Sequence, residues 1–158
     1  MFVAYFLLGA MMIGVDQLAP ISVYDGGWTI TATTTMAGAG KPDELVNHCS
    51  RATAYYACEQ VVNGKPMALI VFTATEVPGK FHTQVVLPDG FSTGRGDLTI
   101  SDNHWTFLGK DVEKDKTTYF RTENYFTGRD KIHFEQYEST DNKTWVKKNE
   151  GDEVRASK

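Results

Sequence analysis

The sequence predicts an all-β fold, a single antiparallel up-and-down β-barrel of about nine strands. Apolar and polar residues alternate with a period of two after Gly27, and short strand-like runs are separated by tight-turn dipeptides such as Asn63-Gly64 and Asp89-Gly90. No segment carries an apolar stripe at helical spacing over three turns. Closing the meander into a barrel removes the exposed strand edges that an open sheet would leave.

The expected elements follow the turn signals along the chain. Residues 28–36 alternate apolar side chains with threonine, which indicates an amphipathic first strand, and residues 37–50 are predicted to be a loop with one helical turn at 42–46. Further strands are expected at residues 53–62, 66–75, 80–87, 91–100, 104–110, 117–127, 131–140 and 144–150.

Turn lengths predict which residues face each other across the hairpins. A tight turn at 102–103 sets Leu98 opposite Phe107, and a tight turn at 78–79 sets Phe72 opposite Val85. These pairs place apolar side chains together on the inner face.

The N-terminus and the cysteines predict a secreted or periplasmic protein. Residues 2–15 form an uncharged apolar run, shorter than the ~20 residues of a membrane span and typical of a signal peptide. We therefore predict a signal peptide at 1–19 and a barrel domain at 20–158; a buried N-terminal element and a truncated gene start are the alternatives. Cys49 and Cys58 are predicted to form a disulfide worth about 2–3 kcal/mol, with two free buried thiols as the alternative.

Charge and motif content exclude several function classes. Sixteen Lys and Arg against twenty Asp and Glu give a net charge of −4, which argues against nucleic acid or an anionic membrane as partner. The chain contains no nucleophile elbow, phosphate loop or zinc-protease motif. Its four histidines lack ligand spacing, so no metal and no cofactor are predicted.

Three carboxylates are the candidates for acid–base chemistry. A three-residue loop at 128–130 sets Glu123 opposite Glu135, and a turn at Asn63-Gly64 sets Glu59 opposite Ala68 on the apolar face. If these groups lined a cavity they would be catalytic residues. The alternatives are a solvated sheet face for the pair, and a register slip that turns Glu59 outward.

Several short motifs resemble those of a known superfamily. Gly26-Gly27-Trp28 opening the first strand, with Arg155 near the end of the last, resembles the lipocalin or calycin pattern. Over residues 26–155 the chain is similar to secreted bacterial lipocalin-like proteins of unknown function. The resemblance implies that Arg155 packs across Trp28 and closes the barrel base. The G-x-W-x-G-x-G signature of haem-binding nitrobindin-like barrels is absent, since Ile30 and Ala32 stand at the later glycine positions.

These observations predict a non-catalytic binding barrel for a small hydrophobic or amphipathic ligand. One alternative is a structural or interaction module with a filled barrel, forming a homodimer through Met67, Leu69 and Val71. Another is a lipocalin-like isomerase, cyclase or hydratase that uses an interior carboxylate. The expected ligand-lining residues are Trp28, Ile30, Ile70, Phe72, Val85, Trp105, Phe107, Phe120 and Phe134.

Overall fold

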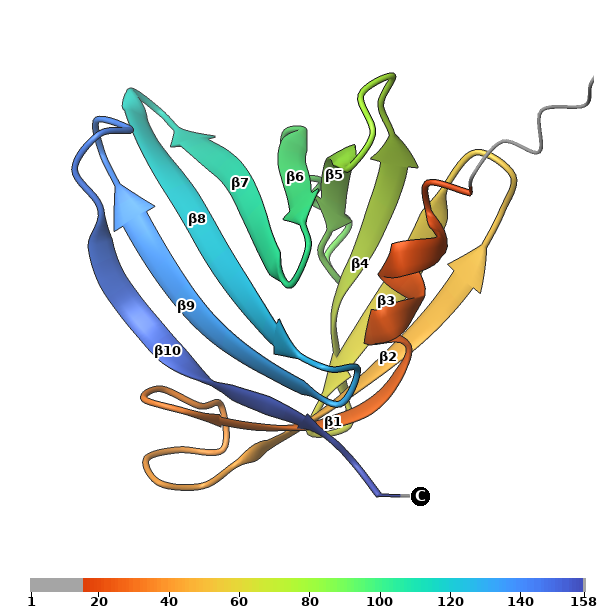
Figure 1. The fold of residues 1–158 in the computed structure, drawn as a ribbon. Coiled ribbons are helices and arrows are strands. Elements are labelled where there is room, and N and C mark those ends of the chain that lie inside the picture. Colours follow the sequence, from red (N-terminus) through yellow and green to blue (C-terminus); the bar gives the residue numbers. More distant parts are fainter. Residues whose placement is uncertain (1–15, 158) are drawn as a thin grey trace, which may run out of the picture.

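The computed structural model describes residues 16–157 and confirms an all-β, antiparallel, closed barrel. The strands follow one another around the barrel in chain order, and β1 closes it by pairing with β10 (Figure 1). The barrel has ten strands: β1 Gly26–Ala32, β2 Asp43–Arg51, β3 Tyr56–Val62, β4 Lys65–Ala74, β5 Lys80–Val86, β6 Gly96–Ser101, β7 His104–Glu113, β8 Lys116–Thr127, β9 Lys131–Ser139 and β10 Val146–Arg155.

The additional strand, absent from the predicted nine, is β2, which lies where a loop with a helical turn was predicted. Its inward positions include Asp43, Leu45 and Asn47, all buried. Two of these three side chains are polar, so the strand has no hydrophobic alternation for a sequence pattern to detect. The prediction of a loop at 37–50 was therefore wrong for its second half.

The hairpin registers agree with the predictions in part. Leu98 faces Phe107, as expected from the tight turn. Phe72, however, pairs with Thr83 rather than Val85. The connection is longer than a two-residue turn, because the backbone N–H of Thr75 bonds the Lys80 carbonyl across it. The shift is two residues, so every side chain keeps its face.

A short 3₁₀ helix, η1 (Ala19–Tyr24), precedes β1 and covers one end of the barrel. The Arg155 guanidinium lies 4.2 Å from the centre of the Trp28 ring, the contact that the lipocalin-like resemblance implied. The same guanidinium donates hydrogen bonds to the carbonyls of Val23 and Asp25, at 2.8 and 2.9 Å. One side chain thus joins the last strand to the segment that leads into the first.

Aromatic side chains fill the covered end. The rings of Tyr24 and Trp105 meet edge to face with centroids 5.5 Å apart, and Trp105 packs on Phe126 at 4.6 Å. Trp28 is fully buried in the same cluster. This end of the barrel is therefore a packed core.

The predicted signal peptide at 1–19 lies mostly outside the described residues. Of its last positions, Leu18 is buried in the core and Asp16 pairs with Arg51 at 2.9 Å. In the stretch from residue 16 to 157 no helix is long and apolar enough to cross a membrane. Processing at the N-terminus stays a prediction.

The predicted disulfide is confirmed. Cys49 on β2 faces Cys58 on β3 directly, and the bond joins neighbouring strands whose Cα atoms are 4.0 Å apart. A disulfide is consistent with an extracellular or periplasmic location.

Candidate functional site

The barrel encloses a cavity of about 510 Å³. It extends from Tyr24, at the end covered by η1, to Thr34–Met36 in the loop between β1 and β2. The structural-module alternative requires an interior that side chains fill along its whole length. The cavity shows that this interior is not filled in that way.

The wall of the cavity is largely apolar. Five of the residues expected to line a ligand site border it: Ile30, Ile70, Phe72, Phe107 and Phe134. Two more of the predicted lining residues, Val85 and Phe120, border an adjoining cavity of about 240 Å³ that shares part of the same wall. The remaining two, Trp28 and Trp105, belong to the packed core at the covered end.

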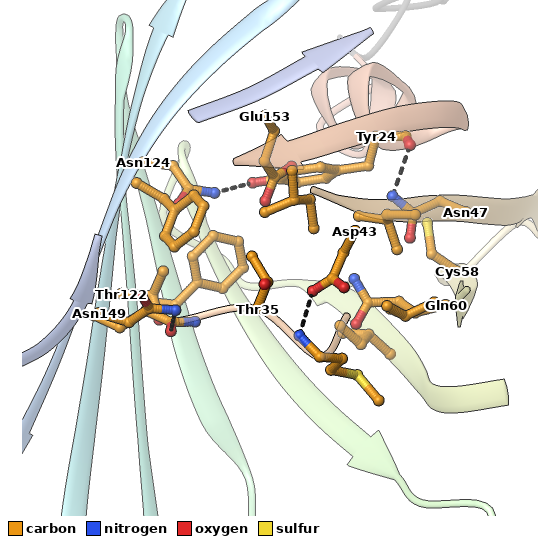
Figure 2. A pocket seen from close by; sticks show the side chains of 18 of the residues that line it. Tyr24, Thr35, Asp43, Asn47, Cys58, Gln60, Thr122, Asn124, Asn149 and Glu153 are labelled. Atoms are coloured by element: carbon orange, nitrogen blue, oxygen red, sulfur yellow. Dashed lines mark hydrogen bonds between the residues drawn. The ribbon is translucent and has the colours of Figure 1, made fainter. Parts of the chain in front are cut away.

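Polar side chains, none of them predicted, also line the cavity. They come from strands on both sides of the barrel and gather in two regions, around Tyr24 and near the β1–β2 loop (Figure 2). No lysine, arginine or histidine belongs to this lining as far as residues 16–157 show it. The polar members are Tyr24, Thr34, Thr35, Asp43, Asn47, Gln60, Thr122, Asn124, Gln136, Asn149 and Glu153.

Glu153 is one of two carboxylates that the described barrel directs into the cavity, and Asp43 is the other. It lies on β10 directly opposite Ile30 of β1, within the strand pairing that closes the barrel. No group between residues 16 and 157 hydrogen bonds or ion pairs with its carboxyl. Loss of hydration raises its pKa from the ordinary 4.5 to about 7.

Tyr24 organises the polar region at the inner end. Asn47 Nδ2 donates to the Tyr24 carbonyl at 3.0 Å, and Asn124 Nδ2 donates to the Tyr24 hydroxyl at 2.8 Å. Both asparagines are buried, and their Oδ1 atoms have no partner among the described residues. Burial, and then the nearby charge of Glu153, raises the pKa of Tyr24 well above its usual value.

Asp43, the second acid of the lining, is buried and already has its hydrogen-bond partners. Its carboxylate accepts the backbone N–H groups of Met36 and Ala37, each at 2.7 Å, and the side-chain amide of Asn63 at 2.8 Å. Burial acts to raise its pKa, but these hydrogen bonds outweigh burial and lower it. Asp43 therefore holds the β1–β2 loop and leaves Glu153 as the unpaired acid of the cavity.

The structure places Glu59 on the outer face, away from the cavity. A β-bulge between Gln60 and Val61 shifts the pairing, so that Glu59 faces Leu69 instead of Ala68. The side chain is exposed, while its neighbour Cys58 points inward. The register-slip alternative therefore describes Glu59, and turn length alone does not reveal the bulge that causes the slip.

Glu123 and Glu135 face each other as predicted, and they also lie on the outer face. Glu123 accepts hydrogen bonds from Thr106 at 2.6 Å and pairs with His104 at 2.7 Å and with Arg121 at 3.2 Å. The solvated-face alternative describes this pair correctly.

Glu135 belongs to a small outer-face cluster with His133 and Glu150, whose ligand-type atoms lie within 4.8 Å of one another. Lys147 Nζ bonds both carboxylates of this cluster. Hydrogen bonds from Lys147, then from Tyr137, lower the pKa of Glu135. The Lys147 ammonium already engages one oxygen of each carboxylate, so the protein's own cation occupies these two ligands.

One sequence signal could have identified Glu153. The resemblance pairs Trp28 with Arg155 across the closing seam, and antiparallel pairing then sets Glu153 opposite Ile30. The predicted last strand ended at residue 150, five residues before the observed end at Arg155, and so left out Glu153. Alternation could also have found Asn124, because it lies on β8 in phase with Phe120 and Phe126. No comparable signal exists for Asn47, on the strand that the sequence did not predict.

Comparisons with known proteins show the fold and nothing finer. No protein-family model and no curated protein matches this chain. Among solved structures, Rv2717c from M. tuberculosis matches with a TM-score of 0.56 and 13% sequence identity, over 90% of this chain and 98% of that one. The chain therefore shares its barrel architecture with Rv2717c.

Proposed function

We propose that the protein is a secreted or periplasmic lipocalin-like barrel that binds a small hydrophobic or amphipathic ligand. The observation that carries the proposal is the open cavity of about 510 Å³, with a mainly apolar wall and polar groups in two regions, around Tyr24 and near the β1–β2 loop. Ligand sites are typically concave, mostly apolar and equipped with a few orienting polar groups. The disulfide supports the compartment, and the Arg155–Trp28 contact supports the lipocalin-like assignment.

Binding of the neutral dye Nile red tests this proposal. We expect its fluorescence to rise and shift to the blue in the wild-type protein, because the dye leaves water for the apolar wall. Ile70→Trp should weaken binding by about tenfold, since Ile70 lines both cavities and the larger ring takes up their shared space. Leu69→Trp is the matched control, on the same strand but on the exposed outer face.

Equal dye affinity in wild type and the Ile70→Trp variant would place the dye outside the barrel and contradict the proposal. A circular dichroism spectrum of both variants checks that the β-barrel is intact, so that a loss of binding reports on the cavity.

The interior carboxyl of Glu153 favours a second candidate, an isomerase, cyclase or hydratase of the lipocalin-like type. A general acid or base works best with a pKa near the working pH, and burial moves the pKa of Glu153 to about 7. The two functions differ in the fate of the ligand: a binding barrel returns its ligand unchanged after long incubation, whereas an enzyme returns a product that mass spectrometry detects.

A further inference from the structure

We infer that the ligand is an amine amphiphile, whose protonated nitrogen sits at Glu153 beside Asn124 while its apolar part lies along the barrel wall. This inference rests on the proposed binding function and names the ligand class. It is drawn from the unpaired acceptors at the inner end of the cavity and from the charges of the whole lining.

The first support is the excess of unpaired acceptors near Tyr24. The Tyr24 carbonyl can only accept a hydrogen bond, so it fixes Asn47 with the Nδ2 group toward it. The Oδ1 atom of Asn47 is then without a donor. Asn124 gives its amide to the Tyr24 hydroxyl and also keeps an unpaired Oδ1. Buried acceptors without donors are costly. Both oxygens have almost no exposed surface, so a ligand N–H group reaches them only when the amide turns toward the cavity.

The second support is the isolation of Glu153. Its carboxyl has no donor or cation among residues 16–157, and the cavity lining there includes no basic side chain. The Tyr24 hydroxyl, which holds Asn124, lies within the field of this carboxyl, so acid and amide border the same part of the cavity (Figure 2). A charge in such a place requires a partner, and the barrel itself supplies none.

The same lining disfavours acids as ligands. A fatty-acid carboxylate would find no cation in the cavity and would meet the charge of Glu153. An alcohol would satisfy one acceptor without balancing the charge. An ammonium group supplies three N–H donors and a positive charge, which is the complement of this region.

Calorimetric titration of the full chain with octylamine, octanol and octanoate at pH 8 tests the inference. The three probes share one apolar chain and differ in the head group. We expect octylamine to bind at least about tenfold more tightly than octanol, and octanoate to bind most weakly. Glu153→Gln should remove the octylamine preference and leave octanol affinity within about twofold. Glu44→Gln, which changes the same charge at an exposed position of β2, should leave the preference intact.

The outcomes separate the two claims. Octanol binding without an octylamine preference, or a preference that survives Glu153→Gln, overturns the amine inference and leaves the binding barrel standing. Failure of all three probes together with Nile red overturns the binding function itself.

Discussion

Two glutamates show how position in the barrel decides the chemistry of a side chain. Glu135, on the outer face, receives hydrogen bonds from Lys147 and Tyr137, and its pKa is lowered. Glu153, on the inner face, is half-buried and has no such partners, and loss of hydration raises its pKa. The two residues have the same functional group, and only the faces of their strands distinguish them.

The raised pKa of Glu153 predicts a pH-dependent cost to the fold. A folded-state pKa above the unfolded value contributes stability below pH 4.5 that is lost as pH rises through about 7. Relative to wild type, Glu153→Gln should therefore gain about 3 kcal/mol of unfolding free energy between pH 4.5 and 8. Urea unfolding at several pH values measures the difference, with Glu44→Gln as the exposed control. A difference that is constant over this range would show that Glu153 is hydrated in the folded protein.

At the scale of elements, β2 connects the stability of the barrel with its cavity. It supplies Asp43, which holds the β1–β2 loop, Asn47, which bonds Tyr24, and Cys49, which is linked to Cys58 of β3. Apolar pairs on this strand are Leu45 with Val62 and Val46 with Val61. Hydrogen bonds and a covalent cross-link add to this apolar pairing at β2.

Reduction of the disulfide should lower the free energy of unfolding by about 2–3 kcal/mol, because it releases the short loop that the bond closes in the unfolded chain. Denaturant titration with and without reductant measures the change. A Cys49→Ala, Cys58→Ala double variant is the control, and its stability should not respond to reductant. An identical midpoint for the oxidised and reduced wild-type protein would contradict the prediction.

At the scale of the whole molecule, the barrel exists because its first and last strands meet. β1 pairs with β10 from Trp28 opposite Arg155 to Ala32 opposite Gly151. At the second end of this seam the chains approach closely: a Cβ atom on Gly151 would collide with the Thr31 carbonyl oxygen and lie 2.7 Å from the Ala32 Cα. Only glycine fits there without moving the backbone.

Gly151→Ala should therefore cost about 1–3 kcal/mol of unfolding free energy, as overpacking typically does. Gly109→Ala is the matched control, since a Cβ at that strand position meets no atom within 4 Å, and its stability should change by less than about 1 kcal/mol. Thermal unfolding of the two variants and the wild type measures the contrast. Equal melting temperatures for the two variants would show that β1 and β10 can move apart at Gly151 without loss of stability, and would contradict the prediction.

The sequence alone determined the fold class, the Leu98–Phe107 register, the facing of Glu123 and Glu135, and the disulfide. Alternation and tight turns are local properties, and both can be recognised in the sequence wherever the inward residues are apolar. The apolar wall of the cavity was predictable for the same reason.

The polar part of the site was decided by the tertiary structure. A polar residue in an alternating pattern faces inward or outward according to its partners across the barrel, and a bulge beside Gln60 was enough to turn Glu59 outward. Closure of the seam turned Glu153 inward, and the contact with Tyr24 gave Asn47 its place. These interactions join residues far apart in the chain, so local patterns could not reveal them.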